Sequence, residues 1–78
     1  MKIEILGTGC AKCKALEEAA KQAVAQSGKF AQVEKVSDLQ KIMAYGVMST
    51  PGLVIDGKVL STGKLLSVNE IVELIQAN

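Results

Sequence analysis

The chain has 78 residues, of which 49% are hydrophobic and 22% are charged. This length predicts one domain, residues 1–78, and the composition is typical of a globular protein rather than a disordered one. Nine Lys and Arg against eight Asp and Glu leave a net charge of +1, and Phe30 and Tyr45 are the only aromatic residues. So weak a charge and so few stacking side chains argue against nucleic acid as a partner.

The N-terminal residues predict neither secretion nor membrane insertion. Ile3, Ile5 and Leu6 precede Gly7, and Glu4 interrupts them, whereas a signal peptide needs an apolar run of about 7–15 residues and a membrane span needs about 20. A cytoplasmic protein is therefore expected, and in that compartment a close cysteine pair is more often catalytic or metal-binding than structural. The absence of histidine from the sequence excludes histidine-based acid–base catalysis.

The first half of the chain predicts strand, helix, strand and helix in turn. Residues 2–6 are rich in β-branched side chains and read as a strand, which Gly7-Thr8-Gly9 ends. A helix is expected from Cys10 to about Ser27, and its apolar face is formed by Leu16, Ala19, Ala20, Ala23 and Val24. A second strand is expected over about residues 31–36. Ser37 and Gln40 have the spacing of a capping box, with Ser37 as the N-cap of a short helix that ends near Gly46.

The second half predicts a hairpin and a final helix. Asp56-Gly57 lies between the apolar runs 53–55 and 58–60, a pattern typical of a tight β-hairpin. Ser67 and Glu70 form a second capping-box pattern at the start of the last helix. The predicted order is β-α-β-α-β-β-α, which indicates an α/β fold with a four-stranded mixed sheet flanked by helices on both faces.

Cys10 and Cys13 are the candidate reactive residues. They follow an expected strand and open an expected helix in a βαβ pattern, which is the context of a redox Cys-x-x-Cys motif. Cys13 falls in line with the apolar face of the helix and should be buried, whereas Cys10 at the helix start should be exposed. Unpaired backbone N–H groups and the helix dipole favour a thiolate there, with a smaller contribution from Lys12 and Lys14. We expect Cys10 to attack a partner disulfide and Cys13 to resolve the mixed disulfide.

Together with Thr50-Pro51 before the predicted hairpin, these cysteines resemble those of the thioredoxin/glutaredoxin superfamily, more closely its small thioredoxin-like redox-active disulfide proteins. The resemblance implies a dithiol–disulfide oxidoreductase whose redox-active disulfide joins Cys10 and Cys13, with no further cofactor. It implies protein disulfide substrates and an unidentified reductase, and we expect a monomer. Ala11-Lys12 stands where thioredoxins have Gly-Pro and glutaredoxins Pro-Tyr, so neither family's redox potential can be transferred.

The resemblance also implies a cis peptide bond before Pro51, with the backbone of Thr50 pairing with an extended segment of the partner protein. The alternative for Pro51 is a trans bond at the start of an edge strand. Tyr45, Val47 and Met48 lead into this loop and are candidates for an apolar docking rim, although core packing is an equal alternative for Val47.

A module that binds soft metals is the main alternative, with Cys10 and Cys13 as its ligands. Heavy-metal-associated domains and copper chaperones also carry Cys-x-x-Cys between a first strand and a first helix, but their order is β-α-β-β-α-β. The predicted helix after Ser37 and the final helix favour the redox fold. A non-enzymatic thiol sensor is a third alternative for the cysteine pair. For Lys12 and Lys14 the alternative is that both are ordinary solvated residues with no effect on the cysteines.

Overall fold

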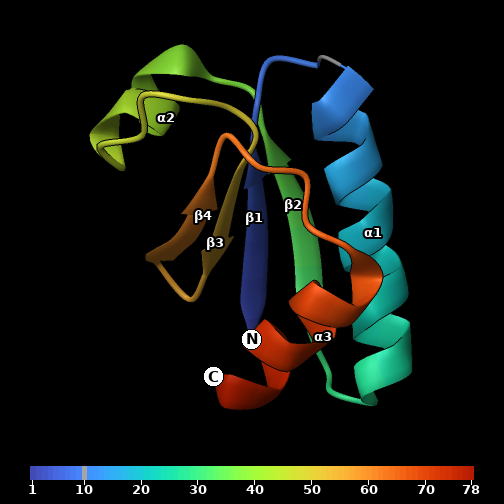
Figure 1. Cartoon of the computed structure of the whole chain (residues 1–78). Helices are drawn as coiled ribbons and strands as arrows, with labels where there is room; N and C mark the ends of the chain where they lie inside the picture. Colours follow the sequence, from blue (N-terminus) through green and yellow to red (C-terminus); the bar gives the residue numbers. More distant parts are fainter. Residues whose placement is uncertain (10) are drawn as a thin grey trace.

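The computed structural model describes residues 1–9 and 11–78, and in this part of the chain one four-stranded sheet lies between helices (Figure 1). The strands are β1 (Lys2–Leu6), β2 (Gln32–Val36), β3 (Gly52–Ile55) and β4 (Lys58–Thr62). The helices are α1 (Ala11–Ser27), α2 (Leu39–Ala44) and α3 (Val68–Ala77). The predicted α/β fold and the predicted order of elements are therefore confirmed.

The sheet is mixed, with the strand order β2-β1-β3-β4. β1 is parallel to β2, which it reaches through α1, and antiparallel to β3. The β3–β4 hairpin turns at Asp56 and Gly57, whose φ angles are 50° and 82°. Both values lie in the left-handed region that the tight primed turn of a hairpin requires, so the Asp-Gly prediction is confirmed.

Two apolar clusters lie on opposite faces of the sheet because successive side chains of a strand point to opposite sides. Ile3 and Ile5 of β1 face α1 and α3, whereas Leu6 faces α2. The α1–α3 cluster is the larger one, and its buried members are Ile3, Ile5, Leu16, Ala20, Ala23, Leu53, Ile55, Leu66, Ile71 and Ile75. The α2 cluster consists of Leu6, Ile42, Val47 and Val54. Helices therefore cover both faces, as predicted.

One helix cap agrees with the sequence prediction and one does not. Ser67 and Glu70 form the predicted capping box at α3, with reciprocal hydrogen bonds of 3.2 and 3.1 Å. At α2 the predicted N-cap was wrong: Asp38, not Ser37, caps the helix, and its Oδ1 accepts a 2.9 Å hydrogen bond from the amide of Gln40. A carboxylate at this position both accepts that bond and complements the positive end of the helix, which favours Asp38 over its serine neighbour.

Of the helices in residues 1–9 and 11–78, none is long and apolar enough to cross a membrane.

Candidate active site

The candidate site lies at the end of the sheet where β1 stops and α1 starts. Leu6, the last residue of β1, pairs with Gly52, the first residue of β3. This register brings the residues just beyond them, Gly7 and Pro51, to the same end of neighbouring strands. The amide of Gly7 donates a 2.9 Å hydrogen bond to the carbonyl of Val36, the last residue of β2. The following loop leads to the start of α1, at the top of Figure 1.

Cys13 lies in the first turn of α1 and is 2% exposed. Its side chain is directed at the backbone of Gly7, where a Cβ atom would lie 2.9 Å from the Cβ of Cys13. The predicted burial of Cys13 is therefore confirmed. Cys10 lies outside the described residues, so its predicted exposure stays a prediction.

Pro51 supplies the second part of the site. The Thr50–Pro51 peptide bond is cis, as the family resemblance implied, so the alternative of a trans proline was wrong. Pro51 is buried and Thr50 is exposed. The carbonyl of Pro51 accepts a 2.8 Å hydrogen bond from Gly63, just beyond β4, which ties the loop to the end of the hairpin.

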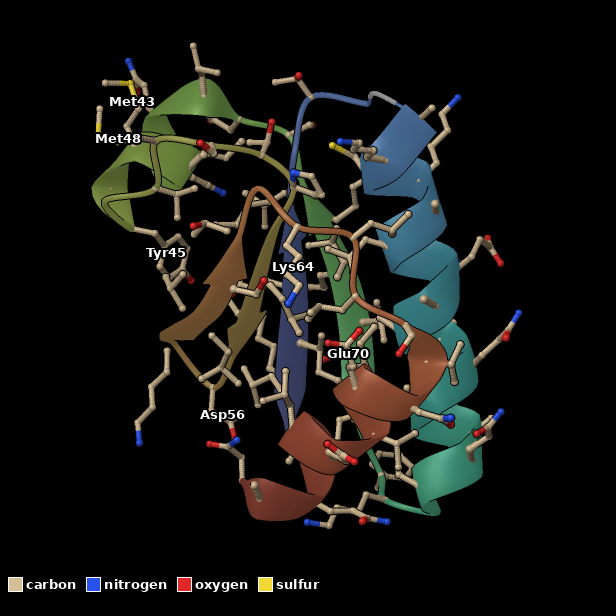
Figure 2. The ribbon with its side chains drawn as sticks, in the orientation of Figure 1. Met43, Tyr45, Met48, Asp56, Lys64 and Glu70 are labelled. Atoms are coloured by element: carbon tan, nitrogen blue, oxygen red, sulfur yellow. The ribbon has the colours of Figure 1, made fainter. Side chains whose placement is uncertain are left out.

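The residues before Thr50 divide between core and surface. Val47 is 8% exposed and packs in the α2 cluster, so it belongs to the core rather than to a docking rim. Met48 is 99% exposed, and Figure 2 shows it at the outer side of the α2 region. Tyr45 is half-buried, and its hydroxyl donates a 2.7 Å hydrogen bond to Oε1 of Glu4. That bond, with burial, raises the pKa of Tyr45 above its usual value.

The charged residues near the cysteines are solvated. Lys12 and Lys14 are both exposed on α1. The suggested effect of Lys12 on the Cys10 thiolate stays a prediction. Lys14 is a solvated surface residue. Within residues 1–9 and 11–78, no cluster of three or more His, Cys, Asp or Glu side chains is arranged to hold a metal ion.

The order of elements separates the two main interpretations of the cysteine pair. In this chain α2 stands between β2 and β3, and the last element is α3. Heavy-metal-associated domains have two consecutive strands after their first helix and end on a strand. The metal-binding alternative is therefore not favoured by the fold.

Comparison with known proteins agrees with this geometry. A family model described as a thioredoxin domain matches residues 1–76. A thioredoxin of Methanothermobacter thermautotrophicus is 40% identical over 75 residues, which cover 96% of this chain and 97% of the relative. A thioredoxin of Methanocaldococcus jannaschii is also 40% identical over 75 residues, covering 96% of this chain and 86% of the relative. The chain therefore belongs to the thioredoxin family, and it is a dithiol–disulfide oxidoreductase.

Proposed function

We propose that Cys10 and Cys13 are the redox-active pair and that they have unequal roles. Cys10 directly precedes the first residue of α1 in the chain and is the attacking thiol. Cys13 lies in the first turn of α1 and is 2% exposed, and it is the resolving thiol. The burial of Cys13 at the sheet end that also carries Pro51 is the observation that supports this assignment most directly.

The proposed reaction is a two-step exchange. The Cys10 thiolate attacks one sulfur of the partner disulfide, forms a mixed disulfide and releases the other partner sulfur as a thiolate. Cys13, as its thiolate, then attacks the Cys10 sulfur, forms the Cys10–Cys13 disulfide and releases the second partner sulfur. The partner gains two electrons and two protons, and the pair loses them. A reductase returns the pair to the dithiol, and no further cofactor takes part.

The exposed residue Thr50 is the proposed docking point for the substrate. An extended segment of the partner protein would align with the Thr50 backbone and add main-chain hydrogen bonds at this edge of the site. Met48, two residues earlier and 99% exposed, would contribute apolar contact. A methionine suits varied partners because its side chain is flexible and polarisable. Lys12 would favour the thiolate form of Cys10 by its charge.

The remaining parts of the proposal concern the setting of the protein. We propose that residues 1–78 act as one domain and as a monomer in the cytoplasm, with protein disulfides as substrates. Light scattering on the purified protein tests the monomer, and a dimer over the working concentration range would contradict it.

The reduction of insulin disulfides by dithiothreitol tests the roles of the cysteines. Wild type should catalyse it, and both Cys10→Ser and Cys13→Ser should lose turnover. When the reduced proteins are freed of dithiothreitol and then mixed with insulin, only Cys13→Ser should accumulate a mixed disulfide, because its attacking thiol remains while its resolving thiol is gone. A stable mixed disulfide in Cys10→Ser, or alkylation of Cys13 before Cys10 at neutral pH, would contradict the assignment. Stoichiometric uptake of Cu(I) or Zn(II) without exchange activity would point to the metal-binding alternative.

A further inference from the structure

Gly7 and Cys13 are packed so closely that any side chain at position 7 would overlap Cys13. Gly7 is buried at the end of β1, and Cys13 is in the first turn of α1. A Cβ atom built on Gly7 would overlap the Sγ of Cys13 and would lie 2.9 Å from its Cβ. Real Cβ atoms essentially never approach that closely, so a side chain here would force the thiol to move.

Glycine is required at this position by space and not by backbone conformation. Gly9 and Gly63, for example, have φ angles of 93° and 67°, in the left-handed region that strains other residues. The φ angle of Gly7 lies outside that region, so an alanine could adopt its backbone conformation without strain. What alanine would add is one methyl group, placed against the Cys13 sulfur.

The backbone at Gly7 and the backbone of α1 are both held in place, so neither can shift freely to relieve the overlap. The amide of Gly7 is held by its 2.9 Å hydrogen bond to Val36, and the preceding Leu6 is paired on both sides in the sheet. On the other side, α1 is anchored to the sheet by Leu16 and Ala20, both fully buried. Rotation of the Cys13 side chain about its Cα–Cβ bond would relieve the overlap of a methyl group at position 7 with Sγ. The 2.9 Å contact with the Cys13 Cβ would remain and would require a small backbone shift. Both responses displace Sγ.

We propose that Gly7 is a positioning residue for the reaction: its bare Cα lets the Cys13 sulfur sit against the end of β1, in the place from which Cys13 resolves the mixed disulfide. This inference rests on the proposed role of Cys13. The reaction between two sulfurs depends on their separation and alignment, and a misplacement of about 1 Å can cost on the order of 100-fold in rate. Gly7→Ala therefore affects the second step of the exchange more than the first.

A single-turnover reaction with the aromatic disulfide dithiobis-nitrobenzoate separates the two steps. Attack by Cys10 on this probe releases one coloured thionitrobenzoate, and attack by Cys13 on the resulting mixed disulfide releases a second. In Gly7→Ala the first release should keep its wild-type rate, while the second should slow by about tenfold or more. A general loss of folding would instead change both releases, because it removes the helix start that favours the Cys10 thiolate as well as the packing of Cys13.

Ala23→Val is the matched control. Ala23 is fully buried at the other end of the α1–sheet contact, ten residues or about 15 Å along the helix from Cys13. The added methyl groups should lower the denaturation midpoint by overpacking, as at position 7, but leave the second release unchanged. A second release that slows equally in Ala23→Val would show that loosening of α1, and not the position of the thiol, is responsible.

A stability measurement covers the case in which Gly7→Ala folds poorly. Cys13→Ala removes Sγ and keeps Cβ, so the loss of stability caused by Gly7→Ala should be smaller in the Cys13→Ala background than in wild type. Equal losses in urea denaturation, including complete unfolding in both backgrounds, would overturn the proposal. So would a second release at the wild-type rate in Gly7→Ala.

The outcomes also separate this inference from the proposed function. If Cys13→Ser releases both thionitrobenzoates, the role of Cys13 as the resolving thiol is wrong. If Cys13→Ser stops after the first release while Gly7→Ala completes both at wild-type rates, the roles of the cysteines stand and the positioning role of Gly7 is wrong.

Discussion

The hydroxyl of Tyr45 donates a 2.7 Å hydrogen bond to Oε1 of Glu4, which joins the end of α2 to the middle of β1. The two residues are 41 positions apart in the chain, and both are half-buried on the face of the sheet that α2 covers. Figure 2 shows Tyr45 beneath α2, below Met43 and Met48. The bond is a polar link beside the small apolar cluster that holds α2 in place.

Tyr45→Phe removes this bond and keeps the ring. We expect a loss of about 1 kcal/mol in the free energy of unfolding, the usual net value of one hydrogen bond. Urea denaturation at pH 7 measures the difference. An unchanged stability would mean that water replaces the bond at no cost.

The same pair predicts a dependence on alkaline pH. The hydrogen bond to Glu4, together with burial, raises the pKa of Tyr45 from the usual 10.0. Folding therefore favours the protonated phenol. The resulting stability is complete below about pH 10 and is lost as the pH rises through the higher pKa of the folded state. The stability difference between wild type and Tyr45→Phe should shrink over that range. A difference that stays constant above pH 10 would contradict this linkage.

The start of α2 allows a comparison of two adjacent residues. Asp38 accepts the 2.9 Å hydrogen bond from the amide of Gln40, and Ser37 precedes it outside the cap. Asp38→Ala should therefore lower the free energy of unfolding by about 1 kcal/mol. Ser37→Ala serves as the control and should change it by less than about 0.5 kcal/mol. The reverse ranking in thermal or urea denaturation would restore Ser37 as the cap.

The cap of α3 predicts a dependence on acidic pH. Hydrogen bonds from Ser67 lower the pKa of Glu70 from its reference value of 4.5, because they favour the carboxylate. The stability from this shift is present above about pH 4.5 and is lost as the pH falls through the lowered pKa of the folded state. Glu70→Gln should lack this part of the acid dependence. Glu73→Gln, an exposed acid in the next turn of α3, is the control and should keep it.

The docking role of Met48 can be compared with that of an equally exposed residue elsewhere. Met48 and Phe30 are both 99% exposed, but Phe30 lies in the α1–β2 connection at the other end of the sheet, at the bottom of Figure 1. Met48→Ser should lower kcat/KM for insulin reduction by about threefold to tenfold, as expected for partial burial of one methionine. Phe30→Ser should leave it unchanged. Equal effects of the two substitutions would argue against docking at Met48.

Much of the secondary structure of this protein can be predicted from short-range patterns in the sequence. The spacing of apolar residues predicts the helices and the burial of Cys13, the Asp56-Gly57 pair predicts the hairpin, and Ser67 with Glu70 predicts the last cap. Each of these features depends on residues within a few positions of one another, so local propensity and periodicity are enough to determine them. The family resemblance added the cis bond before Pro51, which local energetics leave open because the two isomers of a bond to proline differ little.

The tertiary structure decided what depends on the approach of distant segments. Val47 and Met48 are adjacent and apolar, yet one is buried in the α2 cluster and the other is exposed, because the placement of the loop against α2 directs only the Val47 side chain inward. In the sequence Gly7 is simply part of a loop that breaks a strand. Only the packing of α1 on the sheet brings the sulfur of Cys13 against the Cα of Gly7, since α1 and the end of β1 together set the space at that point. The sequence thus determined which residues are the candidates for the chemistry, and the packing determined where the sulfur of Cys13 is held.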